Sequence, residues 1–221
     1  MSTCGDVMLK VCGVTNQEDA DACRAIGASL VGFIFHPESR RNVTPEQVRA
    51  IETPRIMRVG VFVDQSPDEI LHIMDTAGLH LAQLHGDQDV DFCRTVGRNR
   101  VMRAFWPERY DSREALERDL IRYENCCRFY LFDAGSSGGG HGRPFDASWL
   151  KGLCSLKTWF LAGGLGPDNI CEAVTSCDPC GIDLSSGVEA SPGIKDHDKL
   201  NALRSALDGM MRNPNQHCGD F

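Results

Sequence analysis

Two side chains that can exchange protons, a thiol and a carboxyl group, each follow a short apolar run. Cys12 comes directly after residues 8–11, and Asp133 comes directly after residues 129–132. Such runs are typical of buried β-strands, and the C-terminal ends of parallel strands lie at the same edge of a sheet. If both strands belong to one parallel sheet, Cys12 and Asp133 meet there and can serve as one base and one acid.

Lys10 precedes Cys12 by two residues, so the two side chains point to the same face of the predicted strand. An ammonium group nearby favours the thiolate, and we expect it to lower the thiol pKa from about 8.5 toward neutral pH. The alternative is a purely structural cysteine, because free cysteines are among the most buried residues. For Asp133 the alternative is capping of the next turn. The glycine-rich segment 134–144 favours an active-site loop over a helix to cap.

Eight apolar runs that alternate with helical stretches predict the elements that position these residues. The runs are residues 8–11, 30–35, 57–63, 80–84, 101–105, 129–132, 159–162 and 181–184. Alternating strands and helices are typical of a parallel sheet, and eight units spaced by roughly 25 residues fit a closed barrel. The predicted fold class is therefore α/β, a single (β/α)8 TIM barrel with eight parallel strands. We expect one catalytic domain over residues 1–209 and a frayed polar tail over residues 210–221.

Capping signals predict several helix ends independently of hydrophobicity. Capping boxes are expected at Thr15 with Glu18, at Thr44 with Gln47 and at Ser66 with Glu69. Gly27 and Gly78 stand where the first and third helices are expected to end.

The composition favours small-molecule chemistry. Lys and Arg number 23 against 31 Asp and Glu, for a net charge of -8, which argues against nucleic acid or anionic lipid as a partner. The first residues are polar and no apolar run is long enough for a membrane span, so we expect neither a secretory signal nor a membrane anchor. Eleven cysteines without a secretory context predict reduced, buried thiols and a cytoplasmic protein.

Metal binding is not predicted. Cys177 and Cys180 form the single C-x-x-C, and no second pair with zinc spacing follows, so a turn between elements is the favoured interpretation over a metal or redox site. The adjacent Cys126 and Cys127 are expected to pack at the entry to a strand. The histidines show no metal spacing.

Further candidates follow the other predicted strands. His85, Asp64 and Asp183 come at strand ends, and Arg40 and Arg41 follow the second strand. Backbone N–H groups after the seventh and eighth strands of such barrels bind phosphate, and here those segments contain Gly163, Gly164, Ser185, Ser186 and Gly187. A phosphorylated substrate is therefore expected. The alternative is that these glycines only turn the chain. No G-x-x-x-x-G-K-[ST] motif is present, which argues against a nucleoside triphosphate.

At these residues the chain closely resembles the phosphoribosylanthranilate isomerases, barrel enzymes of tryptophan biosynthesis. The resemblance covers nearly the whole length. Its motifs are residues 10–13 with Thr15, residues 32–35 leading to residues 39–41 and Val43, residues 60–63, 83–87, 145–146 and 161–165 with Pro167 and Asn169, and residues 183–189 followed by residues 192–196.

The resemblance implies an Amadori rearrangement of N-(5-phosphoribosyl)anthranilate without a cofactor, by a monomer or a homodimer. The general base of the family falls on Cys12 and its general acid on Asp133. Arg41 aligns with the arginine that binds the anthranilate carboxylate, and Asp183 with an aspartate near the substrate amine. The segment after Asp133 departs from the family, which usually has Thr and Lys at the positions of His141 and Arg143.

Three other functions are alternatives for such a barrel. The related aminoaldose isomerase of histidine biosynthesis is expected to use aspartate at both catalytic positions, whereas this chain has Cys12 at the first. Indoleglycerol phosphate synthase needs a lysine and glutamate set that is not found at the strand ends. A phosphosugar-binding barrel without activity is the alternative from another class, because a fold does not by itself imply catalysis.

Overall fold

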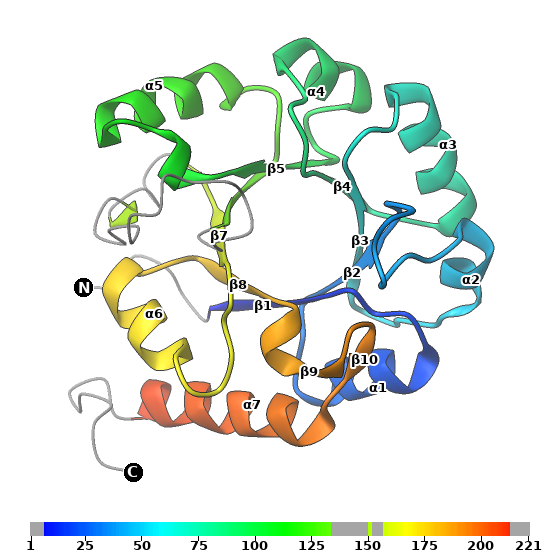
Figure 1. The fold of residues 1–221 in the computed structure, drawn as a ribbon, viewed down its shortest axis with the longest axis vertical. Helices are drawn as coiled ribbons and strands as arrows, with labels where there is room; N and C mark the ends of the chain where they lie inside the picture. Colours follow the sequence, from blue (N-terminus) through cyan, green and yellow to red (C-terminus); the bar gives the residue numbers. More distant parts are fainter. Residues whose placement is uncertain (1–6, 134–149, 152–156, 213–221) are drawn as a thin grey trace.

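The computed structural model describes residues 7–133, 150–151 and 157–212. Eight parallel strands close into a barrel in chain order, with β8 paired to β1 (Figure 1). The strands are β1 (Met8–Cys12), β2 (Leu30–Ile34), β3 (Met57–Phe62), β4 (Leu81–Leu84), β5 (Val101–Phe105), β6 (Phe129–Asp133), β7 (Trp159–Ala162) and β8 (Gly181–Leu184). The predicted (β/α)8 fold class is confirmed.

Helices surround the barrel on its outer side (Figure 1). They are α1 (Gln17–Ala25), α2 (Pro45–Ala50), α3 (Pro67–Ala77), α4 (Val90–Val96), α5 (Arg113–Tyr123), α6 (Ile170–Cys177) and α7 (His197–Arg212), with short 3-10 turns η1 (Pro107–Arg109) and η5 (Ser186–Val188). Between η5 and α7 the chain forms an antiparallel hairpin of β9 (Glu189–Ser191) and β10 (Ile194–Lys195), which the sequence did not predict.

Apolar side chains form two cores because both faces of a parallel barrel are covered. One set fills the barrel interior and includes Leu30, Val59, Leu81, Met102 and Phe160. The larger set lies between the strands and the helices. On several strands the interior positions nearer the C-terminal end are polar instead, as at Lys10, Gln83 and Asp183, and these buried polar side chains mark the candidate site.

Strand and helix ends differ from the predictions by one or two residues. β1 and β6 each extend one residue further than expected, so Cys12 and Asp133 are the last residues of their strands. β2 ends at Ile34 and β3 at Phe62, one residue early, and β4 begins at Leu81, one residue late.

Two of the three predicted capping boxes are confirmed, at Thr44 and at Ser66. The prediction at Thr15 is wrong, because Asn16 caps α1 by accepting a hydrogen bond from the Asp19 amide. Thr15 instead donates its hydroxyl to the carbonyl of Gly193, 2.7 Å away, and so contacts the β9–β10 hairpin. Gly78 ends α3 in the left-handed conformation as predicted. Gly27 follows the C-cap Ile26 of α1 with a positive φ of 77°, and its N–H donates to the Arg24 carbonyl, so the predicted stop at Gly27 is also confirmed.

The cysteines that the structure describes fit the prediction of reduced and buried thiols. All eight of them are buried and free of disulfides. Cys177 ends α6, and the following Asp178 adopts a positive φ of 51°, which is the predicted turn before Cys180. Cys126 and Cys127 are buried before β6 and donate to the carbonyl of Tyr123.

Several predictions lie partly or wholly outside the described residues. The predicted active-site loop with His141 and Arg143 is one of them, and so is most of the expected tail. Its first three residues continue α7, which ends at Arg212 and not at residue 209. Within the described ranges, no helix is long and apolar enough to cross a membrane.

Candidate active site

Cys12 lies beside two lysines that are both fully buried. Lys10, two residues earlier on β1, interacts with the thiol as the alternation of the strand predicts, and Lys195 on β10 donates its ammonium to the Cys12 carbonyl at 2.6 Å. The space for the thiol depends on Gly32, its partner in the β1–β2 ladder. A Cβ at Gly32 would lie 2.8 Å from Cys12 Sγ and 3.2 Å from Lys10 Nζ. A glycine at this position therefore allows the thiol and the ammonium to lie side by side.

The expectation that Lys10 brings the thiol pKa below its ordinary value is wrong for the free protein. Burial raises the pKa of Cys12, and this effect exceeds the opposing influence of the Lys10 and Lys195 charges. Lys10 itself stays charged, because Asp183 and Cys12 raise its pKa although burial acts in the other direction. The thiolate form of Cys12 is therefore favoured by the lysines and opposed by desolvation.

Asp183 on β8 forms a buried ion pair with Lys10. Lys10 Nζ donates to Oδ2 at 2.8 Å, and the two residues also pair in the β1–β8 ladder. The other carboxylate oxygen, Oδ1, is buried and accepts no hydrogen bond from the part of the chain that the structure describes. Asp183 also interacts electrostatically with His85 and Asp133, so it connects the Cys12 side of the barrel to the Asp133 side.

Asp133 ends β6 with about a quarter of its side chain exposed, and it contacts His85, which follows β4. His85 Nε2 lies 3.3 Å from Asp133 Oδ2. The imidazole also makes an edge-on contact with the ring of Trp106, with centroids 5.1 Å apart. Both predicted residues are therefore in one cluster. Asp64, in contrast, is a largely exposed carboxylate that lies near His36.

The two loops predicted to bind phosphate lie against each other. A Cβ at Gly187 would lie 2.1 Å from the Leu165 carbonyl oxygen, and one at Gly166 would lie 3.0 Å from the Gly187 oxygen. The loop after β7 turns at Gly163 and Gly164, which both have positive φ. Ser185 and Ser186 begin the 3-10 turn after β8. The two backbones thus pack closely enough that a side chain is excluded at Gly187 and is crowded at Gly166, and a cradle of backbone N–H groups needs such a close approach.

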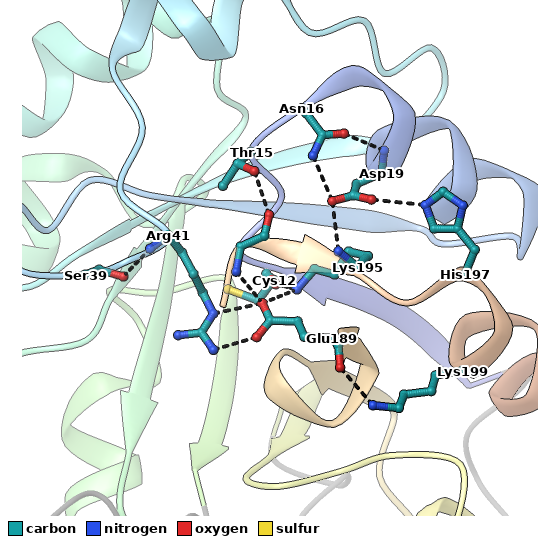
Figure 2. A network of polar contacts seen from close by, with 11 residues as sticks. Cys12, Thr15, Asn16, Asp19, Ser39, Arg41, Glu189, Lys195, His197 and Lys199 are labelled. Atoms are coloured by element: carbon teal, nitrogen blue, oxygen red, sulfur yellow. Dashed lines mark hydrogen bonds and ion pairs between the residues drawn. The ribbon is translucent and has the colours of Figure 1, made fainter. Parts of the chain in front are cut away.

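Arg41 has a partner that the sequence did not predict. Its Nε and Nη2 donate to the two carboxylate oxygens of Glu189, at 2.8 and 2.6 Å, in a bidentate pair (Figure 2). Glu189 is buried and also accepts from Lys195 Nζ at 2.9 Å. Burial alone would raise the pKa of Glu189, but the hydrogen bonds from Arg41 and Lys195 lower it to about 2.

Glu189 and Lys195 are the residues of this site that reasoning from strand ends missed. Both lie in the β9–β10 hairpin, whose strands have only three and two residues and so give no periodic signal. The available signal was their place in the final motifs of the family resemblance, where no role was attached to either. Among the described residues, no group of three or more His, Cys, Asp or Glu side chains is placed to hold a metal ion.

Comparison with known proteins identifies the family. The family model for N-(5'-phosphoribosyl)anthranilate (PRA) isomerase matches residues 9–206. The chain belongs to the PRA isomerase family. The N-(5'-phosphoribosyl)anthranilate isomerase of Maridesulfovibrio salexigens is 43% identical over 201 residues, which cover 91% of this chain and 98% of the relative.

Solved structures of PRA isomerases share the fold. The crystal structure from Thermotoga maritima has a TM-score of 0.80 at 36% identity and covers 92% of this chain and 99% of its own. A second structure is a complex with reduced 1-(o-carboxyphenylamino)-1-deoxyribulose 5-phosphate. It has a TM-score of 0.76 at 34% identity and covers 92% and 99% of the two chains.

Proposed function

We propose that the protein catalyses the Amadori rearrangement of N-(5-phosphoribosyl)anthranilate to 1-(2-carboxyphenylamino)-1-deoxy-D-ribulose 5-phosphate, a step of tryptophan biosynthesis. Protonated Asp133 donates to the furanose ring oxygen, and the C1–O bond breaks to give the open-chain Schiff base. Cys12 then takes the proton from C2, and the electron pair forms the C1–C2 double bond of an enolamine. Protonation at C1 and loss of the hydroxyl proton give the ketone.

The observation that best supports this proposal is the position of Cys12 and Asp133 as the last residues of two parallel strands of one closed barrel. Lys10 favours the thiolate that the second step needs, and Asp183 holds Lys10 beside the thiol. His85 contacts the Asp133 carboxyl group and is suited to orient it. These contacts give the first two proton transfers, to the ring oxygen and from C2, a donor and an acceptor on the protein, as general acid–base catalysis requires.

The remaining site residues are assigned to the three polar ends of the substrate. The backbones around Gly163, Gly164 and residues 185–187 would bind the phosphate. Arg41 would bind the anthranilate carboxylate, for which a planar guanidinium is suited. The unpartnered Oδ1 of Asp183 would accept from the substrate N–H. We propose that this reaction takes place in the cytoplasm and that the protein acts as a monomer or a homodimer.

The proposal is tested by the loss of substrate fluorescence when purified protein is mixed with freshly prepared phosphoribosylanthranilate. We expect saturable turnover without added metal or nucleotide. Binding of the reduced product analogue, measured by calorimetry, reports the site independently of turnover. Binding of the analogue without any turnover would contradict the proposal and favour a phosphosugar-binding barrel.

A further inference from the structure

Glu189 is a buried carboxylate with donors from three sides. Besides Arg41 and Lys195, the backbone N–H of Gly193 lies 3.3 Å from Glu189 Oε1. Figure 2 shows this carboxylate between the Arg41 guanidinium and the Lys195 ammonium, next to Cys12. A buried carboxylate that accepts from two cations and an amide is held in one orientation.

The hairpin that contains Glu189 is fixed to the strand that contains the base. Lys195 Nζ donates to the Cys12 carbonyl, and Thr15 donates to the Gly193 carbonyl in the turn of the hairpin. The Lys195 amide donates to Asp19 on α1 at 2.9 Å (Figure 2). Through these bonds, Glu189 has a defined position relative to Cys12.

Arg41 uses only one edge of its guanidinium for Glu189. Nε and Nη2 form the side-on edge, and no described residue accepts a hydrogen bond from Nη1. Almost a quarter of the side chain is exposed. The stem of Arg41 also crosses the backbone after the base, since a Cβ at Gly13 would lie 2.7 Å from Arg41 Cδ. The end-on edge is therefore available to a ligand carboxylate beside Cys12.

We propose that Glu189 and Lys195 are positioning residues for the carboxylate end of the substrate. Glu189 fixes the side-on edge of Arg41, so that the other edge receives the carboxylate. Lys195 binds both Glu189 and the Cys12 carbonyl, so the distance between carboxylate recognition and the general base is fixed. This inference rests on the proposed function, because it assigns the ligand of Arg41 to the anthranilate ring.

The main alternative is that Glu189 weakens carboxylate binding by Arg41 instead of promoting it. A carboxylate that pairs with Arg41 also neutralises its charge, and removal of a competing carboxylate would strengthen ligand binding. A purely structural role would instead weaken the binding of every ligand to the same extent. The three possibilities differ in the sign of the effect and in its dependence on the carboxylate of the ligand.

The experiment compares two stable ligands, the reduced product analogue and the same molecule without its carboxyl group. We expect Glu189→Gln to raise the Kd of the first ligand at least tenfold and to leave the Kd of the second within about twofold. The KM for phosphoribosylanthranilate should rise more than kcat falls. Tighter binding of the first ligand, or equal weakening of both, would overturn the proposal.

A double-mutant cycle tests whether Glu189 acts through Arg41. We expect Arg41→Ala to weaken binding of the carboxylated ligand, and Glu189→Gln to add little once Arg41 is absent. If the two substitutions change the binding free energy additively, Glu189 does not act through Arg41. Glu189→Gln alone leaves the buried Lys195 charge without its carboxylate partner and can fold poorly. In that case the double variant Glu189→Gln with Lys195→Met, which removes both charges, is used for the same binding comparison.

The matched control is Glu117→Gln. It removes an Arg–Glu pair of similar length, Arg113 Nε to Glu117 Oε1 at 2.8 Å, from the surface of α5. Both ligands should bind this control as they bind the wild type. If the wild-type protein itself neither binds the analogue nor turns over substrate, the proposed function fails. If the wild type binds the analogue and turns over substrate, and Glu189→Gln binds both ligands as the wild type does, the proposed function stands and this inference fails.

Discussion

At the scale of single residues, the chemistry depends on how a buried thiol becomes a base. Desolvation disfavours the thiolate form of Cys12, and two buried ammonium groups favour it. Lys10 lies beside the thiol, and Lys195 donates to the Cys12 carbonyl. Lys10 is shared between Cys12 and Asp183, so its charge is fixed next to the thiol. Because burial and charge act in opposite directions on one pKa, the removal of Lys10 should have a large effect on the pH dependence of the reaction.

Lys10→Met should shift the rising limb of the kcat/KM against pH profile to higher pH, by about one unit or more. At neutral pH this corresponds to at least a tenfold loss of activity. Lys10→Arg keeps a positive charge, so its kcat/KM at neutral pH should be higher than that of Lys10→Met, and its pH profile should shift less. A profile of Lys10→Met that falls uniformly at all pH values would contradict an electrostatic role of Lys10.

At the scale of elements, β2 has a glycine, Gly32, next to the Cys12 and Lys10 side chains of β1. The space beside Cys12 Sγ and Lys10 Nζ exists because residue 32 has no Cβ. Gly32→Ala should reduce kcat at least tenfold by moving the thiol, and overpacking should lower the unfolding free energy by about 1–3 kcal/mol. Steady-state kinetics and thermal unfolding of the same preparations give both values.

Gly209→Ala is the control for this substitution. Gly209 lies in α7, and apart from its chain neighbours and the nearby backbone of its own helix, no described atom lies within 4 Å of the position where its Cβ would be. Alanine there should leave kcat unchanged and should stabilise the helix by about 0.5–1 kcal/mol. Equal activity of Gly32→Ala and Gly209→Ala would show that the close contacts at Gly32 are unimportant for catalysis.

The sequence predicts the elements well where periodicity and caps are strong. Eight strands and the starts of α2 and α3 follow from apolar runs and from the capping boxes at Thr44 and Ser66. The sequence does not decide the start of α1, because Thr15 and Asn16 are both good caps. In the structure Thr15 contacts Gly193 and Asn16 caps the helix. Local signals cannot predict a choice that a contact far along the chain makes.

At the scale of the whole molecule, the barrel brings together groups that are distant in the sequence. Strand order explains how Cys12, Asp183 and Asp133 reach one end, and this was predictable from the spacing of the runs. The pairing of Arg41 with Glu189 was not, because the hairpin strands are too short to detect and an ion pair leaves no pattern in sequence. Burial likewise reversed the expected direction of the Cys12 pKa shift.

The ion pairs of the hairpin should make part of the stability depend on pH. The pKa of Glu189 is about 2 in the folded protein, against about 4.3 in an unfolded chain. A lowered folded pKa stabilises the protein above the unfolded pKa, and this contribution is lost as the pH falls toward 2. The stability difference between wild type and Glu189→Gln should therefore be constant above pH 5 and shrink by about 1–2 kcal/mol between pH 5 and pH 3.

Urea unfolding at each pH measures this difference, with Glu117→Gln as the control. Both side chains of the Glu117 pair are more than a third exposed on a helix surface, so the pair should contribute little at any pH. A difference between wild type and Glu189→Gln that does not change between pH 5 and pH 3 would contradict the low pKa of Glu189.

The most direct test of the acid and base assignment is the turnover of phosphoribosylanthranilate by Cys12→Ser and Asp133→Asn, measured beside the binding of the reduced product analogue. We expect each substitution to lower kcat by about 10²–10⁴-fold, because each removes one proton transfer, while the analogue still binds. Turnover at the wild-type rate by either variant would show that the substituted residue is not the catalytic acid or base.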